Sequence, residues 1–120
     1  MAGLSTEVEQ RVKAKIAEQL EDTVASLCEY VSIPSVSVGD GSGMREAADF
    51  LAQRYRDFGC IEVEVVETST YPGVYAFYDA GAPRTILSYA MYDVRSVGES
   101  AGWLSDPVPR RRSRALDITM

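Results

Sequence analysis

Apolar side chains recur every three or four residues over the first quarter of the chain, which is the spacing of one helix face. The positions are Val8, Val12, Ile16, Leu20, Val24, Leu27 and Val31. Thr6 and Glu9 have capping-box spacing, and the helix should end before Pro34 because the residue preceding a proline disfavours helical geometry. The pattern predicts one long or broken amphipathic helix, followed by an irregular loop over the Ser- and Gly-rich residues 32–43.

A second helical face follows this loop. Its apolar positions are Met44, Ala47, Ala48, Leu51, Tyr55 and Phe58. Gly59 stands where a left-handed residue would close the helix. We therefore expect a helix that ends at this glycine.

The next segments have the patterns of strands. Residues 61–67, "IEVEVVE", alternate between apolar and acidic positions, which predicts a strand with one solvated face. The turn "STYPG" leads to residues 74–79, a second strand and the expected hairpin partner. Residues 85–94, "TILSYAMYDV", alternate less, as expected of a strand covered on both faces. The predicted fold class is α/β, with two helices packed on a mixed sheet of about three strands.

Composition is that of one globular domain: 120 residues, 46% hydrophobic and 25% charged, with a net charge of -6. Residues 1–109 are acidic, whereas residues 110–120 form a basic tail, expected to be disordered or atypical. An acidic body argues against nucleic acid as a partner, and the absence of a long apolar segment argues against a membrane. A cytoplasmic location with reduced Cys28 and Cys60 is the default expectation.

Candidate chemistry is sparse because the chain contains no histidine. Asp93 ends the third predicted strand, a position where functional groups of α/β sheets gather, although such an Asp can also cap a turn. Ser35 and Ser37 fit turn residues better than nucleophiles, since no basic residue is near them in sequence to activate them.

The order of several segments resembles the amino-terminal part of the M20 family of zinc metallopeptidases, which includes dipeptidases, carboxypeptidases, aminoacylases and deacylases. The segments are "LCEYVSIPSVSV", "REAADFLAQRYRDFGC", "IEVEVVET" and "TILSYAMYDVRSVGESAGWLSDPV", between about Leu27 and Pro107. In the family the third strand typically ends Gly-His-x-Asp-Val. The resemblance places the zinc-binding His at Met91 and the aspartate that orients the site, the candidate catalytic residue, at Asp93.

The resemblance implies that residues 1–109 are an incomplete metallopeptidase catalytic domain. A thioether is a weak ligand for Zn²⁺, so we expect Met91 to be a packed side chain and not a metal ligand, and we expect the chain to hold no zinc. The expected function is that of an amino-terminal fragment of a hydrolase of peptide or N-acyl amino acid substrates, inactive by itself. The alternatives are a non-catalytic remnant or protein-binding α/β module, and self-association through an exposed sheet edge.

Overall fold

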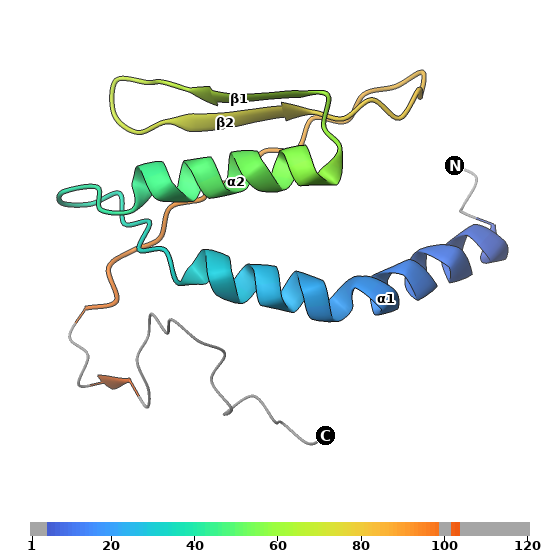
Figure 1. Ribbon diagram of the computed structural model, residues 1–120, viewed down its shortest axis with the longest axis horizontal. Coiled ribbons are helices and arrows are strands. Elements are labelled where there is room, and N and C mark those ends of the chain that lie inside the picture. The colour runs from blue at the N-terminus through green and yellow to red at the C-terminus, as the bar shows by residue number, and fades with distance from the viewer. Residues whose placement is uncertain (1–4, 99–101, 104–120) are drawn as a thin grey trace.

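The computed structural model describes residues 5–98 and 102–103, which include two helices and one two-stranded sheet (Figure 1). The elements in chain order are helix α1 (Thr6–Val31), helix α2 (Met44–Phe58), strand β1 (Glu62–Val66) and strand β2 (Gly73–Phe77). The chain thus has a small α/β fold, with both helices preceding the strands. The basic tail over residues 110–120 lies outside the described residues.

Helix α1 is the long helix that the apolar spacing predicts, and it ends three residues before Pro34. Its N-cap is Ser5 rather than Thr6: the Ser5 hydroxyl accepts a hydrogen bond from the Val8 amide at 3.4 Å. No residue of α1 is buried. Figure 1 shows α1 set apart from the strands, while its last turn contacts α2 through Tyr30.

Helix α2 lies against both strands of the sheet. Its buried residues are Met44, Ala47, Ala48 and Ala52. Three alanines on the buried face let the helix backbone approach the sheet closely. The helix ends at Gly59, whose φ of 96° confirms the predicted left-handed cap. Tyr55 and Phe58, predicted on the same face, remain 42% and 71% exposed.

Gly43 precedes α2 and fixes where the loop meets the helix. Its φ is 76°, a left-handed conformation that favours glycine. A Cβ atom at this position would lie 2.2 Å from the Pro34 carbonyl oxygen. The loop between the helices therefore passes so close to itself at Gly43 that only glycine fits at this position.

The two strands form the predicted antiparallel hairpin. Val63 is opposite Ala76 and Val65 is opposite Val74, so these residues share one half-buried face. Glu62 and Glu64 are exposed, which confirms the alternation predicted for this strand.

The third predicted strand does not join this sheet. Residues 85–91 form no regular secondary structure, and Ile86 and Leu87 are 91% and 89% exposed. Val94 forms a single parallel bridge with Val36. A strand that is covered on both faces needs a paired strand beside it and a packed layer on each face. Helix α2 packs on the hairpin, and no other element among the described residues covers residues 85–91. In the described part of the chain neither helix is long and apolar enough to cross a membrane.

Candidate functional site

Residues 92–94 are held against the loop that follows α1 by a set of hydroxyl groups. The Tyr92 carbonyl oxygen accepts hydrogen bonds from Tyr30 Oη at 2.9 Å and from Ser35 Oγ at 3.1 Å. Ser37 Oγ donates to Asp93 Oδ2 at 2.7 Å. We call these five residues the hydroxyl cluster: Tyr30, Ser35, Ser37, Tyr92 and Asp93. It joins segments that are far apart in the sequence.

The backbone positions this cluster. The last turn of α1 carries Tyr30, whose ring stacks on Phe50 of α2 with centroids 5.6 Å apart. The Val94 amide donates to the Ser35 carbonyl at 2.8 Å, beside the Val36–Val94 bridge. Ser35 is only 3% exposed, so its hydroxyl is satisfied inside the protein rather than by solvent.

Tyr92 extends the cluster to the hairpin, because its hydroxyl donates to the Pro72 carbonyl at 2.6 Å. Burial raises the pKa of both tyrosines of the cluster. Tyr92 and then Asp93 raise the pKa of Tyr30 further, and Asp93 does the same for Tyr92, since a nearby negative charge disfavours a phenolate. Both hydroxyls are therefore protonated donors at neutral pH and not bases.

Asp93, the acid singled out by sequence, is exposed and belongs to this cluster. Its carboxylate binds the Ser37 hydroxyl, which lies 56 positions earlier in the chain. The structure thus brings Asp93 together with a loop serine, although a carboxylate alone is a poor base for a serine hydroxyl. In the structure, the hydrogen bond of Asp93 helps to hold the loop after α1 against residues 92–94.

Met91, the other predicted site residue, does not pack as expected. Its side chain is 78% exposed, whereas the sequence predicted a packed residue. The reason is that residues 85–91 lie outside the sheet, so nothing in the described chain covers them. A solvated thioether and one hydrogen-bonded carboxylate do not suit zinc, which prefers imidazole, thiolate and carboxylate ligands together.

The rest of the described chain also has no cluster of side chains suited to binding a metal. Among residues 5–98 and 102–103, no three His, Cys, Asp or Glu side chains are arranged to hold a metal ion. The residues that the structure describes do not fit the zinc that the resemblance implies, and no hydrolytic step can be derived from them.

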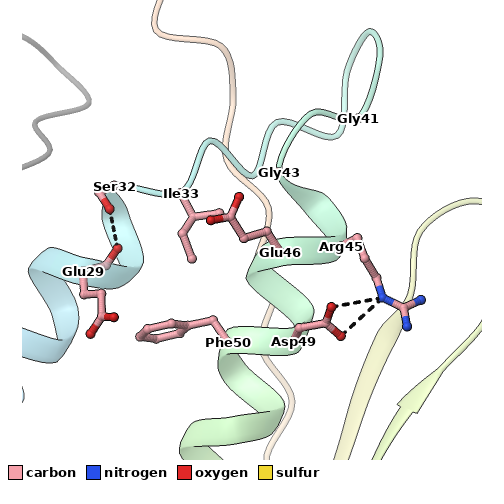
Figure 2. Close-up of a pocket in the computed structure, with 9 residues that line it drawn as sticks. All are labelled: Glu29, Ser32, Ile33, Gly41, Gly43, Arg45, Glu46, Asp49 and Phe50. Carbon is pink, nitrogen blue, oxygen red and sulfur yellow. Dashed lines mark hydrogen bonds and ion pairs between the residues drawn. The ribbon is translucent and has the colours of Figure 1, made fainter.

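A hollow lies between the end of α1, the following loop and the start of α2 (Figure 2). It has a volume of about 880 Å³ and is lined by Glu29, Ser32, Ile33, Gly41, Gly43, Arg45, Glu46, Asp49 and Phe50. The lining contains three carboxylates and one guanidinium, so the hollow has an acidic character. The large apolar side chains of the lining are Ile33 and Phe50, and in Figure 2 the Phe50 ring points from α2 toward the last turn of α1.

The single guanidinium of the hollow is already paired. Arg45 binds Asp49 at 3.3 Å and also forms an ion pair with Glu67 of the segment after β1. The hydrogen bond to Glu67, followed by the charge of Asp49, raises the pKa of Arg45. Both pairs are exposed to solvent, where ion pairs contribute little to stability. The hollow would attract a cationic group, but it contains no nucleophile with a base.

Comparison with known proteins does not assign the chain to a family. No protein-family model, curated protein or solved structure matches it. The class of protein that the fold defines is therefore a small α/β protein, and the family resemblance stays a hypothesis.

Sequence reasoning missed two members of the hydroxyl cluster, Tyr30 and Tyr92. Tyr30 sits among the apolar positions near the end of the first helix, and Tyr92 follows Met91 in the segment taken for a buried strand. Their partners are backbone carbonyls of distant residues, which no local spacing reveals. The one sequence feature that could have indicated this contact was the presence of a tyrosine in each of two segments predicted to be apolar.

Proposed function

We propose that the chain corresponds to the amino-terminal part of an M20-like metal-dependent hydrolase of peptide or N-acyl amino acid amide bonds, and that it is inactive by itself. The observation that supports this most is the parallel bridge between Val36 and Val94, beside the hydrogen bond from Ser37 to Asp93. Asp93 directly precedes the bridge residue Val94, and its partner Ser37 directly follows the bridge residue Val36. The bridge thus joins the two segments that the resemblance places at the site.

The exposed segment before Asp93 supports an incomplete domain. Its apolar side chains Ile86, Leu87, Tyr89 and Met91 are all more than three quarters exposed. Each square ångström of apolar surface left in water forfeits about 25 cal/mol of stabilisation. Further elements that complete the sheet would cover this segment and turn it into the central strand that the resemblance implies.

The lack of activity follows from the chemistry of the described residues. Metal-assisted hydrolysis needs a metal ion, a bound water and a base that accepts its proton. Met91 stands at the position of the His ligand, and Asp93 alone does not replace the missing ligands and base. We therefore expect the purified chain to bind no zinc tightly and to hydrolyse neither dipeptides nor N-acetyl amino acids.

Metal analysis and turnover assays test this directly. The full chain is dialysed against micromolar zinc, its zinc content is measured by plasma mass spectrometry, and hydrolysis of a dipeptide is followed by amine release. Less than a tenth of a zinc ion per chain and turnover equal to the blank are expected. One or two tightly bound zinc ions together with turnover would show that the chain is an active enzyme.

The Met91→His variant tests the ancestral zinc position. Residues 91 and 93 are two apart in the sequence, which is the spacing of the His and the Asp in the family motif. The variant should bind zinc at least tenfold more tightly than the unmodified chain in a competition titration. The matched control is the same variant with Asp93→Ala, which should lose most of this gain; equal affinity in both would count against a shared site.

A protein-binding α/β module is the second candidate function, favoured by the same exposed apolar segment. The DNA downstream of the coding region distinguishes the two. Translation in any frame that continues into a glycine-rich stretch with an aspartate, a Glu-Glu pair and a later histidine would support the hydrolase. A downstream region without these residues would contradict it and leave the binding module as the better description.

A further inference from the structure

The loop before α2 contains an Asp-Gly pair, formed by Asp40 and Gly41. Asp40 is the only aspartate of the sequence that is followed by glycine, and the sequence contains no asparagine. Figure 2 shows Gly41 in the loop that projects from the start of α2. Asp40 is exposed to solvent. Its carboxyl group therefore meets less steric hindrance from the next residue than any other aspartate of the chain does.

The Asp40 side chain folds back over the backbone that follows it. Its Oδ1 atom accepts a hydrogen bond from the Ser42 amide at 2.9 Å, which closes an Asx turn around Gly41. The ring that this hydrogen bond closes includes the Gly41 nitrogen, so the carboxyl carbon is held near that nitrogen. A donor on Oδ1 also stabilises the negative charge that develops on this oxygen when a nucleophile attacks the carboxyl carbon.

The Gly41 amide is available as that nucleophile. Within the part of the chain that the structure describes it donates no hydrogen bond, although the Gly41 carbonyl accepts one from the Met44 amide at 3.1 Å. The amide that follows Asp93, in contrast, belongs to β-branched Val94 and donates to the Ser35 carbonyl at 2.8 Å. Availability of the next amide thus distinguishes Asp40 from the other acid of the chain that lies beside a loop serine.

We propose that Asp40 isomerises spontaneously to isoaspartate. The Gly41 nitrogen forms a bond to the Asp40 carboxyl carbon, and the amide proton and the carboxyl hydroxyl group leave as one water molecule. Water then opens the resulting succinimide: cleavage between the nitrogen and the side-chain carbonyl restores aspartate, and cleavage between the nitrogen and the main-chain carbonyl leaves the chain linked through the side chain. The reaction consumes no oxidant or reductant. It is independent of the proposed function.

Isomerisation should detach the loop from the hairpin. The isoaspartyl link adds one carbon atom to the main chain immediately before Gly41. The Tyr71 ring lies so close to Gly41, whose φ is 69°, that a Cβ atom there would overlap the ring. The longer main chain therefore cannot keep Gly41 in place against Tyr71. The hydrogen bond from the Met44 amide to the Gly41 carbonyl should weaken with this displacement.

Asp79 provides a comparison within the same chain. Its Oδ1 atom accepts a hydrogen bond from the Gly81 amide at 2.7 Å, so it forms the same kind of turn, and it is also exposed. The residue that follows it is Ala80, whose methyl group hinders the approach of the amide nitrogen to the carboxyl carbon. The two aspartates therefore differ mainly in the residue that supplies the nucleophile.

Peptide mapping of the aged full chain tests the site. The chain is kept near neutral pH at about 37 °C for about four weeks, and isoaspartate is located by enzymatic methylation and fragmentation mass spectrometry. Residue 40 should contain about tenfold more isoaspartate than residue 79, which corresponds to a barrier lower by about 1.4 kcal/mol. Asp40→Glu should remove most of the isoaspartate of the chain, and Ala80→Gly should raise residue 79 to the level of residue 40. Equal amounts at residues 40 and 79 of the unmodified chain, or none at residue 40, would overturn the proposal.

The same incubation in concentrated urea tests the contribution of the fold. Urea removes the Asx turn and leaves the Asp-Gly sequence unchanged. Isomerisation at residue 40 should be at least as fast in the folded chain as in urea, because the turn holds the reacting groups together. A folded chain that isomerises much more slowly than the unfolded chain would show that the fold protects Asp40, contrary to the proposal.

Hydrogen exchange of the isomerised form, separated by chromatography, tests the detachment of the loop. The Met44 amide should exchange several times faster than in the fresh chain. The Ile61 amide, which donates to the Phe77 carbonyl at 2.9 Å in the hairpin, is the control and should be unchanged. Unchanged exchange at Met44, or an equal increase at Ile61, would contradict a local loosening.

Discussion

The Tyr92 carbonyl oxygen, which accepts two hydroxyl hydrogen bonds, allows a quantitative test of the hydroxyl cluster. Tyr30→Phe removes one donor and keeps the ring that stacks on Phe50. Ser35→Ala removes the other donor at a position that is 3% exposed. Each single variant leaves the carbonyl with one partner, so each should lower the free energy of unfolding by about 0.5–1.5 kcal/mol.

The variant with both changes leaves this partly buried carbonyl without either donor. An acceptor without a partner costs about 1–3 kcal/mol in desolvation, so the double variant should lose about 1 kcal/mol more than the sum of the single losses. Urea unfolding followed by far-ultraviolet circular dichroism gives all four free energies. Hydrogen exchange at the Val94 amide, which donates to the Ser35 carbonyl, reports local opening of the same contact.

The sign of the coupling energy between the two substitutions decides whether the cluster excludes water. If the losses of the two single variants simply add, the carbonyl is reached by water and the hydroxyl cluster does not close residues 92–94 against the loop. If the Val94 amide exchanges as fast in the original chain as in the double variant, the bridge to Val36 does not persist in solution.

Three further substitutions and one change of pH test the remaining fold. Gly43→Ala should cost at least about 2 kcal/mol in urea unfolding, because its Cβ would meet the Pro34 carbonyl at 2.2 Å. Gly81→Ala, at a φ of 64° with open space around it, should cost only about 1 kcal/mol from backbone strain, and equal losses would refute the steric argument. Ala48→Leu should cost about 1–3 kcal/mol by forcing α2 from the sheet, and an unchanged urea midpoint would mean that this interface is loose. The pKa values of Tyr30 and Tyr92 are raised in the folded chain. The stabilisation is therefore complete below pH 10, where both tyrosines are protonated in the folded and the unfolded chain, and it is lost above pH 10, where the unfolded chain ionises first. A urea midpoint that stays unchanged when the pH is raised from about 9 to about 11 would contradict this.

The sequence patterns correctly predicted those helices and strands that are determined by residues close together in the sequence. The apolar spacing of α1, the Gly59 cap of α2 and the alternation of β1 all depend on residues within a few positions of one another. The N-cap was misplaced by one residue because Ser5 and Thr6 both carry a hydroxyl that can reach an amide of the first turn.

Contacts between distant segments were the part that local patterns could not supply. The apolar composition of residues 85–91 indicated burial, but burial of a strand depends on neighbours that the segment itself does not encode. The same limit applies to the candidate site: Asp93 was selected from its place at the end of this segment, whereas Ser37, its partner, was taken for a turn residue. Their hydrogen bond depends on how the loop after α1 folds back.

The small side chains at the centre of this fold have a thermal consequence. The buried apolar residues of the described chain are Ile33, Met44, Ala47, Ala48 and Ala52, and no large side chain among the described residues is fully buried. The heat capacity gained on unfolding comes mainly from hydrating apolar surface, and this core has little of it to expose. The chain should therefore have a shallow stability curve and melt gradually over a wide temperature range.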